Sequence, residues 1–236
     1  MLKQQNSILI NHAVNKGLNP AALMKDSGIE WIGHIPAHWE VKKLKYVAKT
    51  IKTGRTPPSN LPIDVYSDGI IDWFTPGDFK ETGFLENAEK RVTEYPLKKG
   101  FIDLYPKNSV YLIGIGGTLG KVGLSFKAAS CNQQLNVISF QNEDNAEFCM
   151  WFYFTNRKTI FSLTSYTTMP ILNQFGTKKL PILCPPQSEI REINIKAREI
   201  SKSFDDAQEV ASKEIEKLQE FKQTLIAHAV TGKIKV

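Results

Sequence analysis

The sequence has few cysteines, no long hydrophobic run and no recognisable metal-binding motif. Its three cysteines, Cys131, Cys149 and Cys184, form no C-x-x-C pair, so we expect buried or half-buried free thiols. The longest stretch without a charged residue, 159–177, is rich in Ser, Thr, Asn and Gln and contains Pro170, which excludes a membrane span. Polar residues occupy the positions where a secretory signal would need an apolar segment. We therefore expect a cytoplasmic protein.

Residue patterns that support catalysis are also scarce. His34 and His38 flank Pro36 and cannot form a helical pair of metal ligands. No G-x-S-x-G nucleophile motif is present, and Val122 stands where a phosphate-binding P-loop needs Ser or Thr. We expect no catalytic residues, no metal and no cofactor. A small nuclease or methyltransferase stays as an alternative, based on a run of carboxylates that fits no calcium loop: Asp64, Asp68, Asp72 and Asp78.

Positive charge is concentrated in the middle of the chain. The 236 residues carry a net charge of +6, with a pI near 9.1. Residues 40–185 hold 18 basic and 13 acidic side chains, a net charge of +5, whereas 186–236 holds nine of each. An acidic partner such as nucleic acid is therefore expected to contact the middle of the chain.

The two ends of the sequence repeat each other. Residues 9–14 read LINHAV and residues 225–230 read LIAHAV, with five of six positions identical at an offset of 216. Each copy is followed by Lys and Gly, and glycine is common just past the end of a helix. The repeat indicates that the chain starts near the end of one structural unit and finishes at the end of the next.

A long heptad pattern leads into the second copy. Apolar residues recur at alternating spacings of three and four from 190 to 225, broken there only at Glu214. This predicts one helix over about 187–230, ~66 Å long, with a coiled-coil seam that needs a partner. The seam residues that we expect to bind a partner helix are Ile190, Ile193, Ile200, Phe204, Leu218, Phe221 and Leu225.

Residues 40–185 contain both strand and helix patterns, which predict an α+β domain, here called the globule. The apolar runs at 110–115 and 135–140 read as strands, and 180–184, flanked by prolines, reads as an edge strand. Asp144 and Glu147 resemble a capping box that opens a short helix. Residues 18–40 form a connector punctuated by Pro and Gly.

Three loop-like segments of the globule suit contact with phosphates and base edges. They are 49–59, the glycine segment 114–121 and the hydroxyl-rich segment 165–170. Lys52, Arg55 and Lys121 are candidate phosphate contacts, and Gly117 belongs to a segment whose backbone could approach a phosphate. The candidates for base edges are Thr56, Ser59, Gln133, Gln134, Tyr166 and Thr168. Each feature also has a simpler interpretation: a ligand-free strand turn, solvated surface charges or a satisfied polar turn.

Several segments together resemble one family, the specificity (S) subunits of type I restriction-modification systems. They are MKDSGIEWIGHIPAHW at 24–39, KTGRTP at 52–57, GTLGKVG at 117–123 with Asn132 and Gln133, and LPILCPPQSE at 180–189. The resemblance covers nearly the whole chain. The first and last segments are specific in combination, whereas the glycine segment alone would be weak.

The resemblance implies a non-catalytic subunit that binds double-stranded DNA. Such a subunit holds two target-recognition domains apart on paired long helices and directs methyltransferase (M) subunits, and restriction (R) subunits, to a bipartite site. In this chain it implies a helix end and connector (1–39), one target-recognition domain (40–185) and one spacer or dimerisation helix (186–236). The chain thus resembles a half-subunit, or the second half of a split one.

Two chains are therefore expected to pair antiparallel through the heptad seam as a homodimer. Twofold symmetry would then require an interrupted palindromic target, with the helix setting its gap. The alternative from another class is a protein-interaction module that uses its coiled-coil helix and does not bind DNA.

Overall fold

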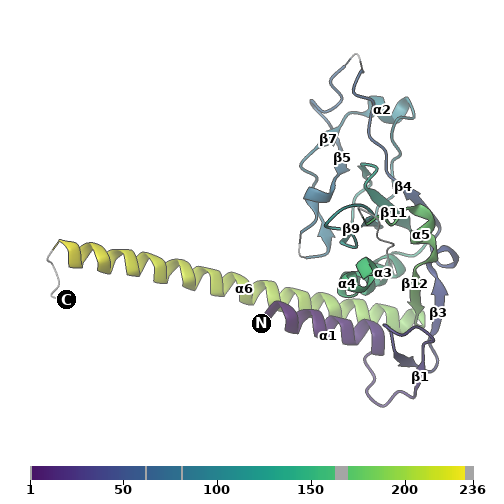
Figure 1. The fold of residues 1–236 in the computed structure, drawn as a ribbon, viewed down its shortest axis with the longest axis horizontal. Helices are drawn as coiled ribbons and strands as arrows, with labels where there is room; N and C mark the ends of the chain where they lie inside the picture. Colours follow the sequence, from purple (N-terminus) through teal and green to yellow (C-terminus); the bar gives the residue numbers. More distant parts are fainter. Residues whose placement is uncertain (1, 62, 81, 163–169, 232–236) are drawn as a thin grey trace.

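One long helix dominates the computed structural model, which describes residues 2–61, 63–80, 82–162 and 170–231. Helix α6 (Gln187–Val230) has 44 residues, and the strands and short helices gather around its first part, so that its second part projects alone (Figure 1). The predicted α+β fold with one long helix is confirmed. None of the described helices is both long and apolar enough to cross a membrane.

A five-stranded sheet forms the centre of the globule, in the order β4-β11-β8-β9-β6. The two runs expected to be strands are β8 and β11, and both are buried along their whole length. Side chains alternate between the two faces of a strand. Accordingly Val110 and Leu112 pack in the core cluster that includes helix α3 (Glu143–Thr155), while Tyr111 and Ile113 belong to a second cluster with Phe74. The strand bounds are β4 (Thr50–Thr53), β6 (Phe84–Leu85), β8 (Ser109–Ile113), β9 (Val122–Ser125) and β11 (Leu135–Ser139).

Smaller sheets attach the rest of the chain to this centre. The 180–184 segment forms an edge strand as expected, and it pairs antiparallel with the strand that begins at Glu40. The remaining strands are β1 (Met24–Asp26) with β2 (His34–Pro36), β12 (Pro181–Cys184) with β3 (Glu40–Lys43), and β5 (Ile71–Phe74) between β7 (Arg91–Val92) and β10 (Ser130–Cys131). The short helices are η1 (Leu44–Tyr46), η2 (Pro76–Asp78), α2 (Glu94–Lys98), α4 (Arg157–Ser162) and α5 (Gln174–Lys179).

The expected capping box at Asp144 and Glu147 is wrong. The N-cap of helix α3 (Glu143–Thr155) lies two residues earlier, at Asn142, whose side chain accepts a hydrogen bond from the backbone N–H of Asp144 at 2.8 Å. Asn142 has the short polar side chain that N-caps favour. Asp144 and Glu147 instead point to α6, where they bind Arg191 and Arg198.

Polar contacts fix the direction in which α6 leaves the globule. The Glu189 carboxylate accepts a hydrogen bond from Trp39 Nε1 at 2.9 Å and lies 2.6 Å from His38 Nε2. Two turns further, the buried Glu147 carboxylate is held by both arms of the Arg198 guanidinium. Because these contacts lie at two separate positions along α6, they fix the direction of its first part relative to the globule.

The heptad seam is buried in its first part and exposed in its last. Ile190 and Ile193 are buried, together with Ala197, and Ile200 and Phe204 are half-buried. Leu218, Phe221 and Leu225 are 66%, 61% and 42% exposed. Helix α1 (Leu2–Lys16) lies antiparallel along the buried part and also contacts α3 (Figure 1). The first part of the seam therefore has a partner within the chain, and the last part has none among the described residues.

Candidate nucleic-acid interface

The loop that follows β4 brings together several of the expected DNA-binding residues. Arg55 forms an ion pair with Asp103 at 3.0 Å, and Lys52 Nζ lies 4.0 Å from the same carboxylate. Thr56 donates a hydrogen bond to the side chain of Gln133. Gly54 makes this approach possible, because a Cβ there would lie 2.1 Å from the carbonyl oxygen of Asn132. The β4 loop and the 132–134 turn thus form one surface.

The side-chain amides of Gln133 and Gln134 in the 132–134 turn differ in their exposure to solvent. Gln133 is exposed, whereas Gln134 is half-buried and accepts a hydrogen bond from Asn132 Nδ2 at 2.9 Å. Ser59 lies further along the β4 loop and is exposed. An exposed amide can pair with a base edge, so Gln133 is better placed for this contact than Gln134.

The glycine segment is a turn between β8 and β9. The backbone N–H groups of Leu119 and Gly120 donate hydrogen bonds to the carbonyls of Gly116 and Ile113. These two donors are therefore satisfied within the turn. Gly117 is exposed and Lys121 is half-buried. The Gly114 N–H donates to the carbonyl of Gln134 at 2.8 Å, which joins this turn to the surface of the 132–134 turn.

Tyr166 and Thr168 lie outside the described residues. The chain that follows them returns beside the glycine turn, where Ile171 pairs with Ile115 and the Leu172 N–H donates to Gly114 at 2.7 Å. Ile171 and Leu172 are therefore anchored at the glycine turn.

A pocket lined by four lysines was missed by the sequence reasoning. This lysine pocket, of about 320 Å³, lies between β4 and α5 and includes Lys45, Lys49, Lys52 and Lys178. Gln174 of α5 holds the two elements together by donating to the carbonyl of Ile51. The signal in the sequence was the basic run 42–52, but Lys178 is distant in the chain and joins it only through the fold.

Three of the four carboxylates of the nuclease alternative hold turns or form ion pairs. Asp64 accepts hydrogen bonds from Ser67 and Tyr66, Asp72 pairs with Arg91 at 3.1 Å, and Asp78 binds Thr75. No group of three or more His, Cys, Asp or Glu side chains in the described ranges could hold a metal ion.

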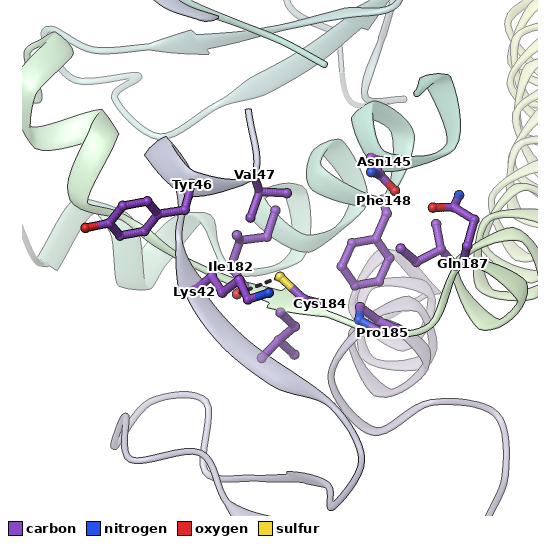
Figure 2. Close-up of a pocket in the computed structure, with 11 residues that line it drawn as sticks. Lys42, Tyr46, Val47, Asn145, Phe148, Ile182, Cys184, Pro185 and Gln187 are labelled. Carbon is purple, nitrogen blue, oxygen red and sulfur yellow. Dashed lines mark hydrogen bonds between the residues drawn. The ribbon is translucent and has the colours of Figure 1, made fainter. Parts of the chain in front are cut away.

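A second pocket, of about 310 Å³, lies where β3, β12, α3 and the start of α6 meet (Figure 2). Its walls include Phe148, Ile182 and Ile190, with Lys42 and Cys184 beside each other. Burial raises the pKa of the Cys184 thiol, and the Lys42 ammonium offsets part of this shift. The thiol is thus a poor nucleophile, because thiolate rather than thiol is the reactive form.

All three thiols are expected to react slowly in the folded chain. Burial also raises the pKa of Cys131 and Cys149, and each unit of increase lowers the thiolate fraction about tenfold. We expect an aromatic disulfide reagent at pH 7.5 to modify the native chain at least ~10-fold more slowly than the denatured chain. Cys184→Ser should remove the fastest native phase. Equal rates for native and denatured chains would contradict this burial.

Comparisons with known proteins agree with this architecture. A model of the type I restriction modification DNA specificity domain matches residues 36–220. The type I restriction enzyme MjaIX specificity subunit of Methanocaldococcus jannaschii is 26% identical over 166 residues, which cover 69% of this chain and 38% of that subunit.

Two solved structures share the fold. A chain from a study of complex assembly and conformational transition of the type I R-M system has a TM-score of 0.66 at 16% identity, covering 96% of this chain and 52% of that one. The HsdS subunit from Thermoanaerobacter tengcongensis has a TM-score of 0.60 at 14% identity, covering 98% and 52%. This chain spans about half the length of these structures, and the match at 36–220 shows that it belongs to the type I restriction modification DNA specificity domain family.

Proposed function

We propose that this chain supplies DNA sequence recognition to a type I restriction-modification enzyme, with its globule reading one half of a bipartite target. The observation that carries this proposal is the specificity-domain match at 36–220, which includes both the globule and most of α6. The chain has no catalytic role in this account. Methylation and cleavage belong to M and R subunits, which it directs to the target in the cytoplasm.

The surface around β4 is the proposed DNA contact. Lys52, Arg55 and Lys121 would bind phosphates, and the lysine pocket extends the basic surface beyond Lys52. Base edges would be read by Thr56, Ser59, Gln133 and Gln134, with Tyr166 and Thr168 added from the hydroxyl-rich segment and Gly117 allowing close approach. Phosphate contacts position a protein on DNA, whereas base contacts specify the sequence.

Lys52→Ala should weaken DNA binding equally for all sequences. Each phosphate contact releases counterions, so its loss should reduce the slope of log affinity against log salt by about 0.9. The measurement is a salt titration of DNA affinity with the complete complex. Lys202→Ala, on the exposed surface of α6, is the matched control and should leave the slope unchanged. An unchanged slope for Lys52→Ala would remove this residue from the interface.

In the proposed domain organisation, residues 1–39 form a helix end and connector, residues 40–185 form the recognition domain, and residues 186–236 form the spacer helix. Two copies would pair antiparallel through the exposed part of the seam, which includes Leu218, Phe221 and Leu225. This homodimer would place one globule at each end of the helices and so resemble a subunit with two recognition domains.

Methylation mapping tests the function directly. Methyltransferase subunits are incubated with genomic DNA with and without this chain, and modified positions are sequenced. We expect methylation at one motif only when the chain is present. Binding of the chain to the methyltransferase without any change in the methylated positions would instead favour a protein-interaction module.

A further inference from the structure

Helix α1 docks through three side chains that recur near the end of α6. Ile10, Ala13 and Val14 of α1 are buried. They belong to one core cluster with Phe152 of α3 and with Ile190, Ile193 and Ala197 of α6. These residues of α3 and α6 are here called the α1 docking surface.

The same residue types stand at the same spacing 216 residues later. Ile226, Ala229 and Val230 correspond to Ile10, Ala13 and Val14, and Ile226 and Val230 are 53% and 81% exposed. The first copy of this apolar face is therefore docked, whereas Ile226 and Val230 of the second copy face solvent. A surface that accepts the first copy has the shape and apolar character to accept the second.

We infer that the α1 docking surface is a binding site for residues 225–230 of a second copy of this chain, and that α1 occupies it as an intramolecular competitor. This inference rests on the proposed pairing of two long helices. In that pairing the end of the partner's α6 runs antiparallel toward the start of this α6. Helix α1 already lies there in the same antiparallel direction (Figure 1).

The competitor has two advantages over the incoming helix end. Asn11 of α1 donates a hydrogen bond to Asn156 at 3.3 Å, whereas the corresponding residue of α6 is Ala227. The α1 helix is also tethered, and a short tether gives an effective concentration on the order of millimolar. With α1 in place, the overlap of two chains is limited to the part of α6 beyond α1. Release of α1 would extend the overlap to the full helix.

The probe for this inference is a fluorescent synthetic peptide of residues 214–234, added to the full chain. Its anisotropy should report at least ~10-fold tighter binding to Val14→Asp, which unseats α1, than to the wild-type chain. His12→Asp changes an exposed residue of α1 and is the matched control, with wild-type affinity expected. A peptide carrying Ile226→Asp and Val230→Asp should not bind.

Hydrogen exchange on the wild-type chain gives a second readout that needs no variant. Saturating peptide should speed exchange of the amides at 7–16, because α1 leaves its surface. The milder Val14→Ala replaces Val14→Asp if the latter does not fold. The inference would be overturned if the wild-type chain and the Val14 variant bound the peptide with equal affinity, or if no chain bound it. It would also be overturned if the peptide carrying Ile226→Asp and Val230→Asp bound as well as the unchanged peptide, or if bound peptide left the hydrogen exchange of α1 unchanged. These readouts involve neither DNA nor methyltransferase, so they fail independently of the proposed recognition function.

Discussion

Replacing Arg198 with alanine is expected to lower the free energy of unfolding by about 2–3 kcal/mol. The Glu147 carboxylate is almost fully buried, and its partners are the Arg198 guanidinium and, at 3.2 Å, Trp151 Nε1. Without the arginine, the buried Glu147 carboxylate keeps only the hydrogen bond from Trp151. This lowers the free energy of unfolding by more than the loss of a surface ion pair does. The measurement is denaturant unfolding at pH 7.

Lys196→Ala is the matched control on the same helix. Lys196 pairs with Glu199 at 3.2 Å, but both side chains are more than half exposed, so its replacement should change stability by less than ~0.5 kcal/mol. If the two variants were equally stable, Glu147 would not depend on Arg198, and the attachment of α6 to α3 would need another explanation.

Replacing both Phe221 and Leu225 with aspartate should abolish self-association. Both side chains are exposed in the single chain, so the globule should keep its stability. In a twofold dimer four large apolar side chains would lose their burial, and at ~1.5 kcal/mol or more for each the dissociation constant should rise at least ~100-fold. Light scattering over a range of concentrations gives the mass of each variant.

The control for this prediction carries the same two charges on the opposite side of the helix. Gln219→Asp with Gln223→Asp should keep the wild-type mass. A wild-type chain that is monomeric at all concentrations would contradict pairing through this seam, as would a double Phe221 and Leu225 variant that still dimerises.

The sequence predicted those elements whose signal is local. The heptad spacing predicted α6, and two continuous apolar runs predicted β8 and β11, because burial selects apolar residues at successive positions of a strand covered on both faces. The cap of α3 was predicted at the wrong residue because Asp144 and Glu147 have the capping-box spacing but bind arginines that lie 47 and 51 residues away.

The candidate interface was predictable only in part for the same reason. Arg55, Thr56 and Gln133 were chosen separately by residue type, and the structure places them on one surface with Asp103. Neither Asp103 nor Lys178 could be assigned to this surface from the sequence, since each reaches it through strand order and helix placement rather than through any local pattern.

The DNA target selected by a heptad-deleted chain separates the role of the globule from the role of α6. Removal of residues 208–214 shortens α6 by ~10 Å, or about three base pairs of B-DNA, and leaves the globule unchanged. Bound sequences are recovered from a randomised DNA library by the complete complex with each chain. We expect the wild-type chain to select an interrupted palindrome, and the deleted chain to select the same half-sites with a gap about three base pairs shorter. An unchanged gap, or altered half-sites, would contradict a globule that reads DNA and a helix that sets the spacing.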